Sequence, residues 1–456
     1  MFRPLLATHN RCSRNVCPLS PTALQTKIIA VCFILLTSCG GGTAPIDNAW
    51  PQKVDGANAA GFSEQGIAGL NAAMEKIVSD KDVAGMVWLL AKDGKVATFE
   101  ATGLAAIDSN RPMTKDTLFR IYSMTKPITG VAMMILYEYG YWDFDDPVSK
   151  FIPEFANLQV MTDYDDDGNV TLEPLRRQPT MRELLNHSAG FGYGLVGNDP
   201  VNKAFRDEGV LISKDLDELV KKVSKIPLRY QPGERWEYSI AVDLQGYIIE
   251  KISGKTLGEF LETQIFKPLG MSDTRFYLLP QDEERFAEVH NWDEDTQGLV
   301  QRPERTDRPP FRDPNRLQSG GGGLVSSTHD YARFLQMLVN GGELDGRRII
   351  TAESVKKMTT NTLRDGLLLR GSETRPGQAG QGFGVDFAII FDPVAAESPQ
   401  GAGTYYWSGA AGTWFWVDPT ANMFWVGMIQ AQGARRPEAG DMRDIAEEII
   451  YKSLLH

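Results

Sequence analysis

Strand-like segments occur near both ends of the chain and are separated by a long region of a different character. Residues 85–91 and 95–99 are largely apolar, and the Asp93-Gly94 pair between them favours a tight hairpin turn. Further strand-like runs occur late in the chain, at 383–391, 405–417 and 423–429. This order predicts an α/β protein of the α+β type, with one antiparallel sheet assembled from both chain ends.

Helical periodicity marks the segments beside and between these strands. Before the first strand, apolar side chains recur at helical spacing, at Ile67, Leu70, Met74 and Ile77. A last amphipathic helix is predicted over about 441–455. Helical patterns also dominate the middle of the chain, for example at 215–223 and 241–252. We therefore expect helices to flank the sheet and a mostly helical second subregion, and we expect the Pro/Arg-rich residues 302–316 to form a loop.

The N-terminus has the pattern of an export signal. It carries positive charge, has no acidic residue before Asp47, and contains an apolar run at 28–36 that is too short to span a membrane. The run ends in Leu36-Thr37-Ser38-Cys39, which resembles a bacterial lipobox whose cysteine is lipidated. We expect a signal peptide at 1–39, a tether at 40–60 and a folded domain at 61–456. The expected location is the bacterial cell envelope, anchored to the membrane through lipid on Cys39 and facing the periplasm. A plain secretory signal, with Cys39 incidental, is the alternative.

Charge and cysteine content exclude several classes of function. The formal net charge of -12 argues against a nucleic-acid partner, which requires a basic surface. All four cysteines lie at or before Cys39. The expected mature domain therefore has no disulfide, no cysteine nucleophile and no cysteine-ligated metal.

Ser123 and Lys126 are the first pair of residues that suggests chemistry. Residues three apart in a helix lie on one face, so an ammonium group at 126 can lie against the Ser123 hydroxyl and favour its deprotonated form. Pro127 is tolerated only near a helix start, which places Ser123 in or just before the first turn. The helix dipole there stabilises negative charge.

The same spacing occurs again at Ser354 and Lys357, so spacing alone does not identify a nucleophile. The surroundings differ. A long apolar helix is predicted after Ser123, at 128–136, whereas Ser354 lies in a charged stretch typical of a solvated surface.

Two downstream segments complete a pattern. One is Trp236-Glu237-Tyr238-Ser239-Ile240, and the other is Trp407-Ser408-Gly409-Ala410-Ala411-Gly412, which we expect inside a strand. Together with Ser123-Met124-Thr125-Lys126, they resemble the penicillin-recognising serine hydrolases. This superfamily includes class C β-lactamases, D-alanyl-D-alanine peptidases and family VIII carboxylesterases, and the last are closest in motifs. The resemblance covers about 63–454 and implies a β-lactamase/transpeptidase-like fold for a β-lactamase-related serine hydrolase domain at 61–456.

The resemblance implies a role for each matching residue. Ser123 would be the acylated nucleophile, and Lys126 and Tyr238 the general base and acid. A phenol acts as a base near neutrality only beside a cation, which Lys126 would supply. The backbone N–H groups of Ser123 and Ala410 would form the oxyanion hole. The substrate-binding positions would be Tyr122, Trp407, Ser408 and Gly409.

Two departures from the β-lactam-processing members bear on the substrate. Those members usually carry Lys-Thr-Gly where this chain has Trp407-Ser408-Gly409, so the cation that holds a substrate carboxylate is missing. Their tyrosine motif usually ends in an amide-binding Asn, where this chain has Ile240. Both departures agree with family VIII esterases and favour a small carboxylic ester as substrate. The alternatives are a β-lactamase, a D-amino-acid peptidase or amidase of the same fold, or a non-catalytic envelope binding module.

Two weaker signals are set aside, and we expect no cofactor and no metal. His187 suggests a Ser-His-Asp triad, but the chain has no Gly-x-Ser-x-Gly elbow to present a serine to it. Residues 163–171 resemble the start of a calcium loop, but the twelfth position is Pro174, where a bidentate Glu is needed. A solvated hairpin explains that segment better.

Overall fold

The computed structural model describes residues 50, 51, 53–367, 369 and 379–455. The predicted signal peptide, Cys39 and residues 40–49 of the predicted tether lie outside these described residues. The later part of that tether belongs to the folded domain. The indole Nε1 of Trp50 donates to the carbonyl of Gly94 at 2.7 Å, and the Asp55 N–H donates to the carbonyl of Val96 at 2.8 Å. The folded domain therefore begins before residue 61.

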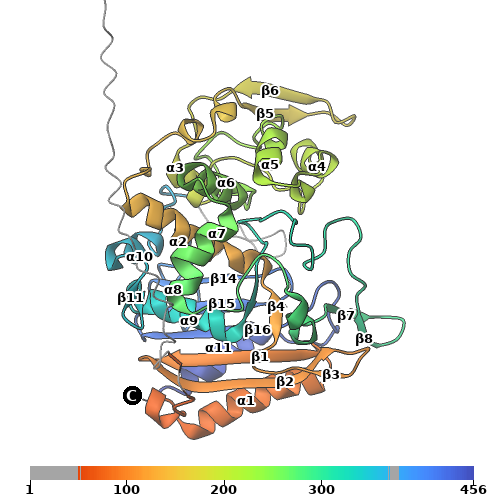
Figure 1. Ribbon diagram of the computed structural model, residues 1–456, viewed down its shortest axis with the longest axis vertical. Helices are drawn as coiled ribbons and strands as arrows, with labels where there is room; N and C mark the ends of the chain where they lie inside the picture. The colour runs from red at the N-terminus through yellow and green to blue at the C-terminus, as the bar shows by residue number, and fades with distance from the viewer. Residues whose placement is uncertain (1–49, 52, 368, 370–378, 456) are drawn as a thin grey trace, which may run out of the picture. The chain divides into compact units, whose positions relative to one another are not determined.

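One eight-stranded antiparallel sheet joins the two ends of the chain, as the sequence predicts. Its order is β12-β13-β14-β15-β16-β1-β2-β3. The N-terminal strand β1 (Gly85–Lys92) pairs with the C-terminal strand β16 (Met423–Met428) on one side and with β2 (Lys95–Ala106) on the other. The remaining strands are β3 (Arg111–Pro112), β12 (Gln381–Phe383), β13 (Ala388–Ile390), β14 (Thr404–Ser408) and β15 (Trp414–Asp418). Figure 1 shows the orange strands of the N-terminal part beside the blue strands of the C-terminal part.

The predicted hairpin between β1 and β2 is confirmed. Asp93 and Gly94 both have positive φ, at 53° and 72°. Two consecutive residues of this kind form the turn whose twist matches that of the strands it joins, and aspartate followed by glycine adopts it at low cost.

The two late apolar runs each contain a turn, so their prediction as single strands was wrong. Residues 383–391 turn between β12 and β13, and residues 405–417 turn between β14 and β15. Both faces of this part of the sheet are covered, so the strands and the tight turns between them are equally apolar and hydropathy does not separate them.

Helices cover both faces of the sheet. The predicted helices at each end of the domain are α1 (Glu64–Ser79) and α11 (Met442–Lys452), and they pack together on one face against Trp88 and Leu90 of β1. Leu89 of β1 points to the other face and joins the main hydrophobic core. That face is covered by α9 (Thr328–Val339), and Figure 1 shows the helical subregion beyond it.

The helical subregion begins with α2 (Thr125–Glu138), of which twelve residues are buried. The helices predicted in the middle of the chain are confirmed as α5 (Leu216–Val223) and α6 (Ala241–Ser253). The other α-helices are α3 (Met181–Leu185), α4 (Pro200–Asp207), α7 (Leu257–Leu261), α8 (Lys267–Leu269) and α10 (Ala352–Met358).

Short strand pairs complete the domain: β4 (Leu118–Arg120) with β9 (Val325–Ser327), β5 (Gln159–Tyr164) with β6 (Val170–Pro174), β7 (His290–Asp293) with β8 (Gly298–Gln301), and β10 (Glu343–Leu344) with β11 (Arg347–Arg348). None of the helices in the described part of the chain is long and apolar enough to cross a bilayer.

A buried carboxyl group lies in the turn between β12 and β13. Asp386 has no exposed surface, and its Oδ1 accepts from the Gln245 side chain at 3.1 Å. Its Oδ2 has no hydrogen-bond partner among the described residues. Burial raises the pKa of Asp386 well above its ordinary value, so folding favours the protonated form of this group.

Replacing this carboxyl group by an amide is expected to stabilise the protein. In the wild type the unfolded state releases the Asp386 proton above about pH 4, whereas the folded state keeps it up to its raised pKa. Between these two pKa values the free energy of unfolding falls by about 1.4 kcal/mol for each unit by which the pH rises. Asp386→Asn removes this loss and keeps a side chain suited to the positive φ of 59°. Thermal unfolding of both proteins between pH 4 and pH 8 should show a gain in melting temperature that grows with pH. A difference in melting temperature that does not change with pH would contradict a buried, protonated Asp386. So would a gain that grows with pH in the exposed control Asp166→Asn.

Candidate active site

Ser123 lies in a short 3-10 helix, Tyr122–Met124, that leads directly into α2. It follows β4, which anchors the segment by pairing with β9. Pro127 is the third residue of α2, where its missing N–H costs little. The sequence-based expectation that Ser123 stands just before the first turn of a buried helix is therefore confirmed.

The structure brings Ser123, Lys126 and Tyr238 together. The Tyr238 hydroxyl donates to Ser123 Oγ at 2.6 Å, and Lys126 Nζ lies 3.4 Å from the same oxygen. Ser123 is partly exposed, whereas Lys126 has no exposed surface. One solvent-accessible hydroxyl is thus in contact with a buried amine and a phenol, which are the groups needed to remove and return its proton.

Lys126 is held by fixed acceptors. Besides Ser123, Nζ donates to the Gly321 carbonyl at 2.6 Å and to the Tyr193 hydroxyl at 3.1 Å. It also lies 4.6 Å from the centre of the Tyr238 ring, a position in which a cation is attracted to the ring face. These contacts fix the amine without a direct carboxylate partner among the described residues, so its charge remains available to the two hydroxyl groups beside it.

Tyr193 and Asp243 are site residues that the sequence did not single out. Nothing in the sequence around Tyr193 separates it from aromatic residues that fill a core. Burial, followed by the nearby Asp243, raises the pKa of Tyr193 well above its ordinary value, so this phenol stays neutral and accepts from Lys126. The Asp243 carboxylate accepts from the Gly321 N–H at 3.2 Å and from the Ser319 hydroxyl, which fixes the segment whose carbonyl binds Lys126. A Cβ on Gly321 would lie 2.4 Å from Asp243 Oδ2, so this close approach requires glycine.

Tyr238 is positioned by a cluster of rings. The ring centres of His187, Tyr193 and Trp407 lie 5.1, 5.4 and 5.4 Å from that of Tyr238. His187 Nδ1 accepts from the Ser239 N–H at 3.2 Å, which fixes the residue after Tyr238. Burial, followed by the charge of Lys126, holds the pKa of His187 well below its ordinary value, so the ring is neutral. His187 therefore supports the tyrosine, as expected for a residue outside any Ser-His-Asp triad.

The third motif ends β14 and forms the turn to β15, which corrects its predicted place inside a strand. Trp407 and Ser408 are the last residues of β14, and the turn is closed by a hydrogen bond from the Gly412 N–H to the Gly409 carbonyl at 3.0 Å. This turn hydrogen bond does not use the N–H of Ala410, whose residue is exposed. A Cβ on Gly409 would lie 2.3 Å from the carbonyl oxygen of Ile121, so glycine lets the turn approach the segment that leads to Ser123.

The rival pair at Ser354 and Lys357 has a structural explanation. Ser354 lies in α10 and, contrary to the expected solvated surface, is buried; its N–H and hydroxyl contact the capping residue Thr351. The Lys357 side chain pairs with Glu353 at 3.1 Å on the same helix. The two residues therefore have separate partners.

The segment that resembles a calcium loop is a hairpin turn. Asp165 accepts from the N–H groups of Asp167 and Asn169 and from the Asn169 side chain, so its oxygens serve the turn between β5 and β6. Across the described residues, no group of three or more histidine, cysteine, aspartate or glutamate side chains is arranged to hold a metal ion.

Comparisons with known proteins identify relatives of this chain. A family model described as Beta-lactamase matches residues 70–448. The esterase EstB of Burkholderia gladioli is 32% identical over 358 residues, which cover 75% of this chain and 84% of EstB. A putative D-alanyl-D-alanine carboxypeptidase of Escherichia coli is 31% identical over 300 residues, or 61% of this chain and 65% of that protein. The solved structure of EstCE1, a hydrolase with promiscuous acyltransferase activity, superposes with a TM-score of 0.69 at 24% identity, covering 85% of this chain and 99% of EstCE1.

The family match spans most of the described domain, and the EstB match covers most of both proteins. The sheet with helices on both faces agrees with the fold of the structural neighbours. The chain therefore belongs to the beta-lactamase family and is a serine hydrolase.

Proposed function

We propose that this protein hydrolyses carboxylic esters through an acyl-enzyme on Ser123. The observation that carries the proposal is the 2.6 Å hydrogen bond between Tyr238 and Ser123 Oγ beside the buried Lys126, at a site whose wall is the ring of Trp407. EstB, an esterase by name, is a relative over three quarters of the chain, which supports the same chemistry.

Acylation begins with proton transfer from the Ser123 hydroxyl. In its anionic form Tyr238 accepts that proton, and the Lys126 ammonium beside it stabilises the anion. Ser123 Oγ then forms a bond to the ester carbonyl carbon. When the tetrahedral intermediate collapses, the ester C–O bond breaks and the alcohol leaves with the proton from Tyr238. Water then loses a proton to Tyr238 and attacks the acyl carbon. As the bond between that carbon and Ser123 Oγ breaks, Tyr238 returns the proton to Oγ and the acid is released.

The oxyanion of each tetrahedral intermediate requires two hydrogen-bond donors. We assign the backbone N–H groups of Ser123 and Ala410 to this role. Ser123 stands just before α2, where the helix dipole favours negative charge. Ala410 is exposed in the turn that packs against Ile121, two residues before Ser123. Preorganised donors of this kind typically contribute a hundredfold to a thousandfold to the rate.

The walls of the site favour an ester over a peptide-like substrate. Trp407 occupies the position of the lysine that binds a substrate carboxylate in β-lactam-processing members. Its ring packs on those of Tyr238 and Phe383, with ring centres 5.4 Å apart in both pairs. The position of the amide-binding Asn is occupied by Ile240, a fully buried residue that caps α6. The Trp407 ring is compatible with an acyl chain, and Ile240 offers no polar group to a peptide amide.

A comparison of substrates tests the proposal. We expect kcat/KM for p-nitrophenyl esters of short acyl chains to exceed kcat/KM for nitrocefin, and we expect no release of D-alanine from an acyl-D-alanyl-D-alanine peptide. The same assays on Ser123→Ala give the background. Markedly faster turnover of nitrocefin would make the protein a β-lactamase, release of D-alanine would make it a peptidase, and either result would overturn the esterase assignment.

A further inference from the structure

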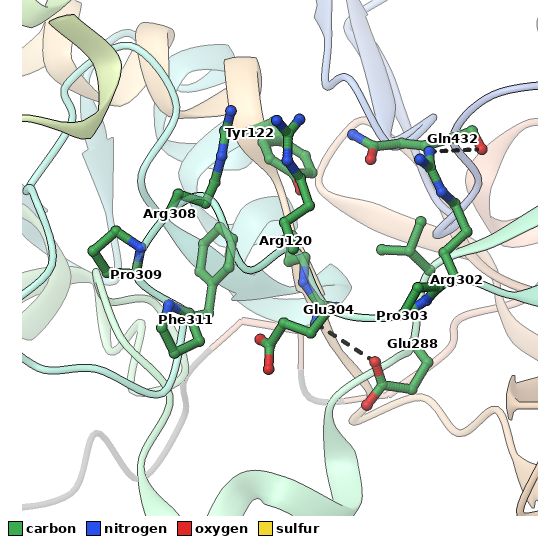
Figure 2. A pocket seen from close by; sticks show the side chains of 13 residues that line it. Arg120, Tyr122, Glu288, Arg302, Pro303, Glu304, Arg308, Pro309, Phe311 and Gln432 are labelled. Carbon is green, nitrogen blue, oxygen red and sulfur yellow. Dashed lines mark hydrogen bonds and ion pairs between the residues drawn. The ribbon is translucent and has the colours of Figure 1, made fainter. Parts of the chain in front are cut away.

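A pocket rich in arginine opens beside Tyr122, the residue before the nucleophile (Figure 2). Its walls come from the end of β4, from the loop that begins after β8, and from the segment that follows β16. Its lining includes two glutamates, Glu288 and Glu304, and four arginines, Arg120, Arg302, Arg305 and Arg308. Such a concentration of positive charge is unexpected in a chain whose net charge is -12.

The pocket borders the catalytic segments on two sides. Tyr122 has a positive φ of 41°, and its ring packs edge-on against Phe311 at 6.0 Å rather than against Tyr238. On the opposite side, the lining residue Gln432 follows Ala431, whose N–H donates to the Ala411 carbonyl at 2.8 Å. That carbonyl belongs to the turn to which we assign an oxyanion-hole donor. The pocket therefore lies beside both segments to which we assign catalytic groups.

Most of the charges in and around the pocket are already paired. Both carboxylate oxygens of Glu304 accept from Arg312 at 3.1 Å, and Arg305 pairs with Asp307 on the same loop. Glu288 lies 3.6 Å from the guanidinium groups of both Arg120 and Arg312. The two lining glutamates are therefore engaged by Arg120 and Arg312.

Arg302 and Arg308 form no ion pair with any described residue. Arg302 donates to the Gln432 carbonyl at 3.4 Å, whereas Arg308 Nε is buried and has no hydrogen-bond partner among the described residues. Figure 2 shows its side chain running past Phe311 with its guanidinium group towards Tyr122. Burial, followed by the neighbouring charge of Arg305, lowers the pKa of Arg308, but a guanidinium group still remains protonated at neutral pH. A half-buried cation with unused donors is therefore available beside Tyr122.

We propose that Arg308 binds a carboxylate carried by the substrate, so that the preferred esters are singly charged rather than neutral. The planar guanidinium group matches a carboxylate in a two-point hydrogen bond. This inference rests on the proposed ester hydrolysis. It places the recognition of a charged group on the Tyr122 side of the site, and not on the strand where Trp407 replaces the family's lysine.

Kinetics with matched neutral and charged esters test this role. The neutral ester is p-nitrophenyl butanoate; one charged ester, p-nitrophenyl hydrogen glutarate, carries the carboxylate on the acyl chain, and another, p-butanoyloxybenzoate, carries it on the alcohol side. We expect Arg308→Gln to lower kcat/KM at least tenfold for one of the charged esters, mainly through KM, since a charge-assisted hydrogen bond is lost. Turnover of the neutral ester should stay within twofold. Arg347→Gln makes the same charge change at an exposed arginine of β11, outside the pocket, and should leave all three esters within twofold.

The outcomes separate this inference from the proposed function. Equal effects of Arg308→Gln on charged and neutral esters, or no effect on any of them, would overturn the carboxylate site. Failure of the wild type to hydrolyse any ester would instead overturn the esterase proposal, and thermal unfolding would then decide the anion site. Glutarate should raise the melting temperature of the wild type but not of Arg308→Gln. The absence of a rise in the wild type, or an equal rise in both proteins, would contradict the site. A rise with inorganic phosphate and none with glutarate would show that the bound group is a phosphate and would overturn the assignment to a carboxylate.

Discussion

Lys126→Met is expected to lower kcat/KM for a p-nitrophenyl ester by about a thousandfold or more. The variant removes the charge beside the Ser123 and Tyr238 hydroxyls. Without this charge the Tyr238 anion is no longer stabilised, and the transfer of the Ser123 proton to Tyr238 becomes unfavourable. Methionine fills the same buried space without a charge, so the fold should be preserved. Steady-state kinetics, with thermal unfolding as the check on folding, measure this effect.

The rival motif supplies the control for this variant. Lys357→Met makes the same substitution at the second Ser-x-x-Lys pair, where the lysine is partly exposed and paired with Glu353. Its activity should stay within twofold of the wild type. A Lys126→Met protein that keeps a tenth or more of wild-type activity would remove the lysine from the proposed proton-transfer path.

Ser123→Ala is expected to lower kcat/KM by about ten thousandfold or more, to the level that binding and the oxyanion donors alone provide. The substitution removes the oxygen to which the acyl group attaches and leaves the surrounding contacts of Lys126 with Gly321 and Tyr193 in place. Ester hydrolysis measured by the release of p-nitrophenol detects the loss. Ser354→Ala is the matched control and should retain full turnover, because Ser354 serves only the cap of α10. Equal losses in the two variants would mean that Ser123 has no special role.

The sheet could be predicted from sequence because its strongest signals are local. The Asp93-Gly94 turn and the apolar strands on either side are adjacent in the chain, and they mark the start of the sheet without any knowledge of tertiary contacts. The late strands were harder to delimit. Gly384 and Asp386 form one turn and Gly409 to Gly412 form another, but both turns lie inside apolar runs because they are packed between other elements.

In the site, too, contacts between residues close in the sequence could be predicted, whereas contacts between distant segments could not. Ser123 and Lys126 are three residues apart on one helix, so their contact could be predicted from spacing. The partners that hold Lys126 could not. Tyr193 and Gly321 lie 67 and 195 residues further along the chain, and their side chain and carbonyl meet Lys126 only because the helical subregion folds over α2. Nothing in the local sequence distinguishes this tyrosine from those that fill the core.

The arginine-rich loop illustrates why composition alone is a weak guide to function. Residues 302–316 were predicted as a loop, and they form one. Their charges become informative only when each arginine is assigned a partner. Arg312 and Arg305 pair with carboxylates, and Arg302 and Arg316 donate to backbone carbonyls. Arg308 has neither kind of partner among the described residues. The location of this unpaired cation beside Tyr122 could not be read from the sequence, because Tyr122 is 186 residues away in the chain.

The covalent acyl-enzyme is the central claim, and intact-protein mass spectrometry after treatment with a fluorophosphonate tests it most directly. We predict that the wild-type protein gains the mass of one phosphonyl group, that Ser354→Ala gains the same mass, and that Ser123→Ala gains none. The absence of an adduct on the wild type would indicate a non-catalytic binding module. An adduct that persists in Ser123→Ala would place the nucleophile elsewhere, and either result would contradict the account.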